Sequence, residues 1–97
     1  MPVNQKDDEN SVMTVGKSYF IRTVTHYLLG TYLITVDGFA KFSGASWVAD
    51  TGRFSEMIKT GKVNEVEYCE LSSPVSVNLG SVVDIWPWNH SLLTVTK

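Results

Sequence analysis

The chain contains very little of what metal sites and disulfides are built from. Its 97 residues include one cysteine, Cys69, and two histidines, His26 and His90. A single thiol cannot form an internal disulfide, and two histidines without a closely spaced pair of ligands do not make a structural zinc site. We therefore expect no metal site and no cofactor, and we expect Cys69 to be a small core residue.

Charge is also scarce, and long apolar runs are absent. Eight Lys and Arg residues stand against ten Asp and Glu residues, for a net charge of -2 at pH 7. Proteins that grip nucleic acid or an anionic membrane need an excess of positive charge, so we expect neither partner. No stretch approaches the ~18 apolar residues of a membrane span, and the first ten residues are unlike a signal peptide. These absences, with the single cysteine, predict a cytosolic or intravirion protein.

The remaining composition is that of an ordinary folded domain. Hydrophobic residues make up 43% and aromatic residues 11% of the chain, which is enough for one modest core at this length. Residues 1–11 are polar and supply almost nothing to bury, so we expect a flexible leader or an arm that orders on a partner. Residues 12–97 contain no linker and no repeat, and we predict one globular domain there.

Segments rich in β-branched and aromatic residues predict a sheet. The expected strands cover residues 17–27, 31–36, 39–42, 63–71, 75–77 and 81–86. Gly30 allows a bend or bulge, and Asp37-Gly38 is a strong hairpin signal because both residues tolerate positive φ. Pro87 lacks a backbone donor, so the last strand must end there or lie at an edge. The pattern does not decide which face of the first strand is buried.

One helix is expected, at about Gly52–Thr60. Asp50 or Thr51 can cap its start, and Gly61 is a natural residue just past its end. Apolar side chains recur at the helical spacing i, i+3, i+4, which predicts a stripe that packs on the sheet; they are Phe54, Met57 and Ile58. The fold class that follows is α+β: a small curled antiparallel sheet or partly open barrel of five to six short strands with one helix.

Two short motifs resemble catalytic sequences. Asp50-Thr51-Gly52 is the triplet that carries the catalytic carboxylate in aspartic proteases, whose retroviral members are dimers of chains about this long. Those proteases place a small residue next, where this chain has Arg53, and they need a C-terminal helix that is not expected here. Gly16-Lys17-Ser18 resembles the end of a phosphate-binding loop, but Ser11 stands where the pattern requires glycine. We therefore expect the protein not to be an enzyme.

Aromatic side chains are abundant for a domain of this size. The simpler interpretation places Trp47 and Trp86 in the core. The segment Trp86-Pro87-Trp88 is harder to bury completely because the proline stops the strand, and Trp and Tyr are typical of interfaces. We therefore expect an interface between copies of the chain at Trp86, Trp88 and Tyr68.

Few cationic side chains are present, and they are isolated enough to lie in a pocket beside aromatic rings. Stacking together with one or two guanidiniums holds a nucleotide-like anion without catalysis. The predicted ligand-binding residues are Arg22, Tyr27, Lys41, Trp47 and Arg53.

Several motifs together resemble a family of small, largely uncharacterised proteins encoded by bacteriophages and prophages. They are Tyr19-Phe-Ile-Arg-Thr-Val-Thr, Gly30, Ala45-Ser-Trp47, Phe54-Ser-Glu with Gly61, and Val82-Val-Asp-Ile-Trp86. The resemblance covers about 70 residues, from Lys17 to Trp88, and it carries over no catalytic residue.

The resemblance implies a phage accessory protein, for which three roles are open. The first is a homo-oligomeric binder that sequesters a nucleotide-derived signal of the host's antiviral defence, in the host cytoplasm. The second is a virion component, decorating the particle or associated with its tail, whose leader orders against a neighbour. The third is a direct inhibitor of a host defence protein.

Overall fold

The computed structural model describes residues 12–69, 73–94 and 96–97. The predicted leader at residues 1–11 lies outside the described residues. The elements, in chain order, are β1 (Ser18–Thr23), β2 (Tyr27–Val36), β3 (Phe39–Asp50), α2 (Phe54–Thr60), β4 (Glu65–Tyr68), β5 (Val75–Asn78), the 3-10 turn η1 (Leu79–Ser81) and β6 (Val82–Pro87). The six strands form one antiparallel sheet that stays open, and with α2 they make the small α+β fold that the sequence predicts.

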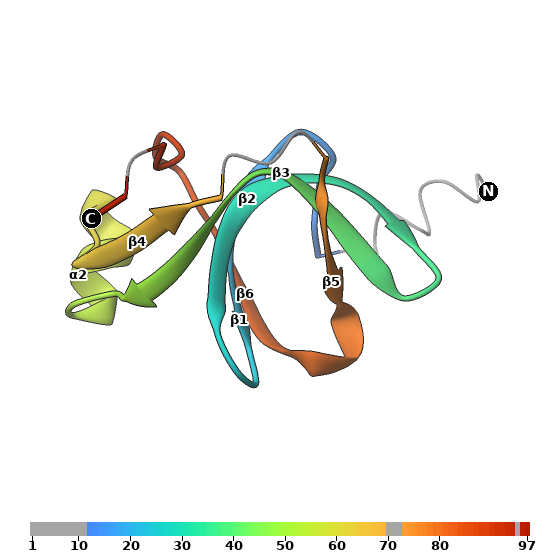
Figure 1. Ribbon diagram of the computed structural model, residues 1–97, viewed down its shortest axis with the longest axis horizontal. Coiled ribbons are helices and arrows are strands. Elements are labelled where there is room, and N and C mark those ends of the chain that lie inside the picture. The colour runs from blue at the N-terminus through green and yellow to red at the C-terminus, as the bar shows by residue number, and fades with distance from the viewer. Residues whose placement is uncertain (1–11, 70–72, 95) are drawn as a thin grey trace.

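The long strand β3 organises the sheet. Along one edge it pairs with β2, and along the other it pairs first with β5 and then with β4. The strand order β4-β3-β2-β1-β6 places β4 and β6 at opposite ends of the sheet. Because η1 links β5 to β6 in a single turn, the two strands draw opposite edges of the sheet toward each other, and the sheet curls (Figure 1).

Both faces of the curled sheet are buried, which settles the question that the first strand left open. Tyr19 and Ile21 face an inner core, whereas Phe20 between them faces an outer core. The inner core lies within the curl and is closed mainly by strands; its buried members are Met13, Tyr19, Ile21, Leu28, Tyr32, Ala40, Phe42 and Val77. Alternate residues of β1 therefore supply apolar side chains to the two different cores. They do not divide into a buried apolar face and an exposed polar face.

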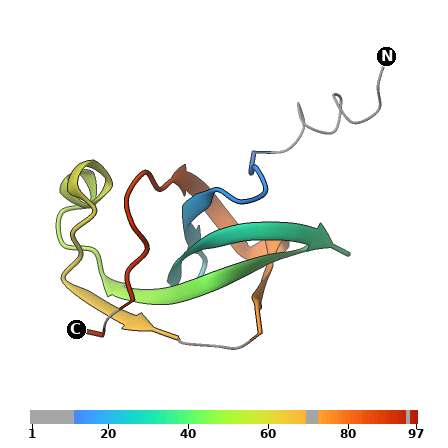
Figure 2. The same ribbon diagram turned by 90° about the horizontal axis from the view of Figure 1, so that it is seen from above.

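The outer core is closed by segments that are not strands. Its buried members are Phe20, Leu29, Val48, Met57, Val63, Val66 and Trp88. Met57 is fully buried, and Phe54 and Ile58 pack beside it, so the apolar stripe predicted for the helix is confirmed. Figure 2 shows α2 and the C-terminal segment on one side of the molecule and the β2–β3 hairpin projecting from the other.

The start of α2 differs from the prediction. The N-cap residue is Arg53, and its side chain makes no capping hydrogen bond. Asp50 instead accepts a hydrogen bond from the Gly52 N–H at 2.9 Å, and the Thr51 hydroxyl donates to the Gly52 carbonyl at 2.7 Å. Both side chains are therefore engaged in the turn before the helix, three and two residues ahead of the N-cap.

The end of α2 is as predicted. Gly61 has a φ of 79° and its N–H donates to the Met57 carbonyl. A Cβ at this position would lie 2.7 Å from the His90 ring, and the His90 Nε2 lies 2.8 Å from the Ile58 carbonyl oxygen. His90 thus ties the C-terminal segment to the last turn of the helix, where free carbonyls need a donor.

Two strand boundaries also differ. The segment predicted as one strand over 17–27 is broken after Thr23, whose backbone N–H and hydroxyl both donate to the His26 carbonyl. The irregularity expected at Gly30 is present within β2, where the pairing with β3 shifts register between Leu29 and Thr31, and a Cβ at Gly30 would lie 2.9 Å from the Cβ of Phe42. The predicted strand 39–42 is the first third of β3, which runs on through residue 50. In the described part of the chain, no helix has the length and apolar character needed to cross a bilayer.

Candidate functional site

A hollow of about 180 Å³ opens on the surface where β1 meets β6. It is lined by Arg22, Thr23, Tyr27 and Val83. Arg22 and Tyr27 are brought together because they are a cross-strand pair in the β1–β2 register, and such pairs hold their side chains on the same face.

Arg22, which lines the hollow, also forms an ion pair. Arg22 and Asp84 are also a cross-strand pair, between β1 and β6. The guanidinium binds the carboxylate in a bidentate ion pair. Arg22 Nε donates to Asp84 Oδ1 at 2.8 Å, and Arg22 Nη2 donates to Asp84 Oδ2. Side-chain exposures of 34% and 30% leave both groups accessible to a ligand.

The bidentate contact with Arg22 favours the charged form of the Asp84 carboxylate. Hydrogen bonding from Arg22 holds the pKa of Asp84 below its ordinary value, against the desolvation that partial burial brings, and Trp86 adds a smaller contribution in the same direction. The hydrogen bond with Asp84 likewise raises the pKa of Arg22. The pair therefore carries one positive and one negative charge at neutral pH, with little net charge.

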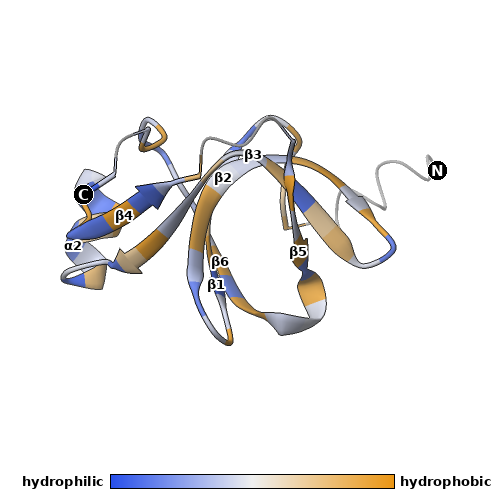
Figure 3. Cartoon of the chain, in the orientation of Figure 1, coloured by the Kyte–Doolittle hydropathy of each residue, from blue (hydrophilic) through white to orange (hydrophobic). Residues whose placement is uncertain are grey.

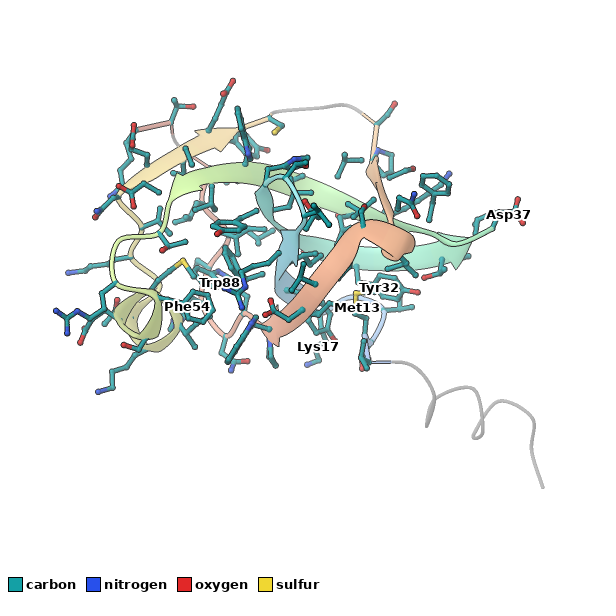
Figure 4. All side chains as sticks on the ribbon, turned by 90° about the horizontal axis from the view of Figure 1, so that it is seen from below. Met13, Lys17, Tyr32, Asp37, Phe54 and Trp88 are labelled. Carbon is teal, nitrogen blue, oxygen red and sulfur yellow. The ribbon has the colours of Figure 1, made fainter. Side chains whose placement is uncertain are left out.

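Aromatic rings border the ion pair. The guanidinium carbon of Arg22 lies 5.1 Å from the centre of the Phe54 ring, a cation–π contact. The Phe54 ring meets Trp86 edge-on at 5.0 Å, and Trp86 remains 36% exposed. Phe54 comes from α2 and Trp86 from β6, so this border exists only because the helix packs on the outer face; Figure 4 shows Phe54 on that side, near Trp88.

Two of the five predicted ligand residues therefore meet in one place, and a third lies close in the chain. Arg22 and Tyr27 line the hollow. Arg53 immediately precedes Phe54, and its side chain is exposed at the start of the helix.

The other two predicted ligand residues lie elsewhere. Trp47 lies opposite Leu28 on β2, so its side chain is on the face opposite Tyr27; it is 45% exposed and meets His26 edge-on at 6.2 Å. Lys41 pairs with Ile34 in the hairpin half of the sheet. The sheet separates Trp47 from the hollow. Lys41 lies between Ala40 and Phe42, which face the inner core, so it is on the same face as Arg22 but in the hairpin half of the sheet.

The expectations for the core and for the interface need correction. Trp47 and Trp86 are exposed, and Cys69 is only half-buried. Trp88 is 4% exposed, with its indole N–H donating to the Ser91 carbonyl at 3.1 Å, so it offers a partner no surface. Proline does stop the strand, but the chain then turns inward and takes Trp88 into the outer core.

The predicted interface set is also divided in space. Tyr68 lies on β4 and Trp86 on β6, at opposite ends of the strand order. The edge of β4 that does not pair with β3 is covered by the C-terminal residue Lys97. Lys97 and Val66 exchange two backbone hydrogen bonds, at 2.9 and 2.8 Å.

Sequence reasoning missed Asp84, Phe54, Thr23 and Val83. Phe54 was assigned to the core stripe, and only its half-burial beside Arg22 reveals a second role. Asp84 had one usable signal: an acidic residue in the otherwise apolar run Val82–Trp86 needs a partner or an exposed position. Its partner is 62 residues away in sequence, so the signal did not identify Arg22.

The groups at this site can bind a ligand by hydrogen bonding and stacking. Across residues 12–69, 73–94 and 96–97, no group of three or more His, Cys, Asp or Glu side chains is placed to hold a metal ion. Comparisons with protein-family models, with curated proteins and with solved structures find no match for the chain.

Proposed function

We propose that the chain is a non-enzymatic binding module that holds a small nucleotide-derived ligand at the Arg22 hollow. The observation that carries the proposal is that Arg22, which lines the hollow with Tyr27, is paired with an accessible carboxylate and lies beside the Phe54–Trp86 ring pair. In the bacteriophage setting that the family resemblance implies, the ligand is a signal of the host's antiviral defence, and the module removes it from solution in the host cytoplasm.

Electrostatics favours the base of such a ligand over its phosphates at the ion pair. A phosphate beside Arg22 would also lie beside the Asp84 carboxylate, whose lowered pKa keeps it charged. A planar ring with a neighbouring donor and acceptor is better matched, because Asp84 has lone pairs to accept and Arg22 has N–H groups left to donate. In this orientation the base stacks near Trp86, and the phosphates extend toward solvent or toward Arg53.

The small size of the hollow suggests that a second subunit is needed to enclose the ligand. Ligand pockets commonly enclose about 300–1,000 Å³, whereas this hollow measures about 180 Å³. It can hold a ring but not an entire nucleotide. A homo-oligomer in which another subunit covers the exposed Trp86 surface would complete the enclosure.

The first experiment identifies the ligand. The protein is expressed beside an active defence system, purified and heated, and the released small molecules are analysed by mass spectrometry. A released compound containing a nucleobase supports the proposal. An empty protein that is found in purified virions would favour the virion role, and an empty protein that co-purifies with a host defence factor would favour the inhibitor role.

The second experiment localises the site. Affinities for nucleosides and nucleotides are measured by calorimetry for the wild type and for the variants Arg22→Gln, Asp84→Asn and Trp86→Ala. Loss of a charge-assisted hydrogen bond or of a stacking partner, each worth about 1–3 kcal/mol, weakens binding about 5- to 150-fold. Lys62→Gln, an exposed cation just after the helix, is the control and leaves affinity unchanged. Equal affinity across all four variants would place the ligand elsewhere, and turnover of any bound compound would overturn the non-enzymatic assignment.

A further inference from the structure

The β2–β3 hairpin carries apolar side chains that the fold does not cover. Ile34, Val36 and Phe39 keep 52%, 45% and 43% of their surface exposed. Val36 lies opposite Phe39 in the register, and Ile34 lies two residues before Val36, so all three share one face. We call these three residues the hairpin patch. Neither α2 nor the C-terminal segment reaches it, because both lie at the other end of the molecule (Figure 2).

The backbone next to the hairpin patch is also free. Strand β1 pairs with β2 only from Tyr27 to Thr31, and the pairing ends where Lys17 and Gly16 bond to Tyr32 at 2.9 Å. Within the described residues, that edge of β2 has no partner over residues 33–36. An open edge with apolar side chains beside it is a template for another strand.

We propose that this edge is a dimer surface, on which β2 of a second copy pairs antiparallel with β2 of the first. A two-fold axis near Thr35 places Val36 of each copy opposite Ile34 of the other. Such an interface is self-complementary, since the same four edge residues supply the backbone donors and acceptors on both sides. It also joins two hairpin patches into one larger apolar surface.

Charge at the two limits of the open edge favours a second copy over an arbitrary extended peptide. Asp37 lies at the tip of the hairpin, held in the turn at a φ of 51°. Lys17 lies at the other limit, where β1 ends against Tyr32. Figure 4 shows Asp37 at the far tip and Lys17 and Tyr32 near the base. In the proposed register Asp37 of each copy comes opposite Leu33 of the other and beside its Lys17, so opposite charges meet twice.

The interface is small, which determines the strength expected of it. Specific interfaces that bury less than about 1,200 Å² in total belong to weak or transient complexes. A strand pairing of four residues with three apolar side chains on each copy falls in this class. We therefore expect a reversible dimer whose population rises across the micromolar range.

Sedimentation equilibrium of the full chain, from about 1 µM to about 1 mM, tests the proposal. The wild type shifts from monomer to dimer over this range. Ile34→Glu places two carboxylates across the apolar contact and abolishes the dimer, while Lys17→Asp brings like charges together and weakens it at least tenfold. Val24→Glu, at a 73% exposed valine in the turn at the opposite end of β2, is the matched control and leaves the dimer intact.

A second measurement needs no substitution. Amide hydrogen exchange of the wild type is recorded at low and high concentration, and the outward amides of residues 33–36 slow only at high concentration. A chain that stays monomeric throughout, or a dimer that Ile34→Glu and Val24→Glu affect equally, overturns the proposal. The hairpin edge is distinct from the Arg22 hollow, so either outcome leaves the ligand-binding proposal to its own test.

Discussion

The two faces of the sheet are closed in different ways. The inner core is enclosed by strands and by the segment before β1, and its polar groups are satisfied locally: the Tyr32 hydroxyl lies 2.7 Å from the Thr35 hydroxyl. The outer core is covered by α2 and by the residues that follow β6. The partly exposed Arg22–Asp84 pair lies at its edge. In Figure 3 apolar colour lies along the strands, while the hairpin turn is hydrophilic.

Under the proposed function, this difference separates the part of the molecule that stabilises the fold from the part that binds the ligand. The buried members of the inner core are apolar side chains on the strands and on the segment before β1, and they hold the curl of the sheet. The outer core carries the hollow at its border, where a helix residue and two strands meet. A change in the outer core is therefore expected to reach the hollow, whereas an inner change of similar cost is not.

The largest expected effect comes from truncating one phenylalanine in each core. Phe20 is 0% and Phe42 is 2% exposed, and a buried Phe→Ala change costs about 3–5 kcal/mol in the free energy of unfolding. Phe20 also contacts the rings of Tyr27 and Phe54, each at 5.8 Å. Urea unfolding should show similar losses for Phe20→Ala and Phe42→Ala, but only Phe20→Ala should alter ligand affinity and the chemical shift of the Trp86 indole. Equal disturbance of Trp86 by both variants would contradict the separation.

A smaller loss is expected where the two hairpin strands approach most closely. Gly30→Ala would place a methyl group 2.9 Å from Phe42 Cβ and 3.3 Å from the Ser43 carbonyl, and neither atom is at the flexible end of a side chain. Overpacking of this kind costs about 1–3 kcal/mol. Gly80→Ala is the control, because its nearest neighbour is the side-chain oxygen of Asn78 at 3.2 Å. Thermal unfolding that ranks the two variants in the opposite order would show that the sheet can move apart at Gly30.

The smallest effect concerns the ion pair and depends on pH. The pKa of Asp84 is lowered in the folded state by hydrogen bonding from Arg22, so its contribution is complete above the ordinary Asp pKa of about 4 and is lost as the pH falls through the lowered value. The wild type should be more stable than Asp84→Asn at pH 7, and the two unfolding free energies should converge below about pH 4. The other carboxylates are common to both proteins. A difference that stays constant with pH would mean that the pair adds no charge-dependent stability.

Local patterns predicted most elements because their causes are local. Asp37-Gly38 makes the hairpin through the positive φ of both residues, 51° and 81°, and Gly61 ends the helix for the same reason. The break after Thr23 was missed because no glycine or proline marks it; a threonine hydroxyl closes that turn by bonding to the backbone. The full length of β3 was missed as well, since its two halves are held by different partners, β5 and β4.

The candidate site was predictable only in part. Arg22 and Tyr27 stood out as a cation and an aromatic ring of one apolar segment, and antiparallel pairing across a short turn made them neighbours. Asp84 and Phe54 reach the same place from distant parts of the chain, and periodicity carries no information about such distances. Trp88 was misplaced because a proline shows where a strand ends but not the direction in which the chain continues.

The sequence by itself determined that this chain forms an antiparallel sheet with one helix, because β-branched and aromatic spacing, turn residues and the helical apolar stripe act over a few residues. Only the tertiary structure decided that each face of the sheet carries a buried core, that Arg22 is held by Asp84, and that, among the described residues, the hairpin edge has no partner strand. Those outcomes depend on which segments, distant in sequence, cover each face of the sheet. The short link η1 between β5 and β6 curls the sheet and so determines which segments come together.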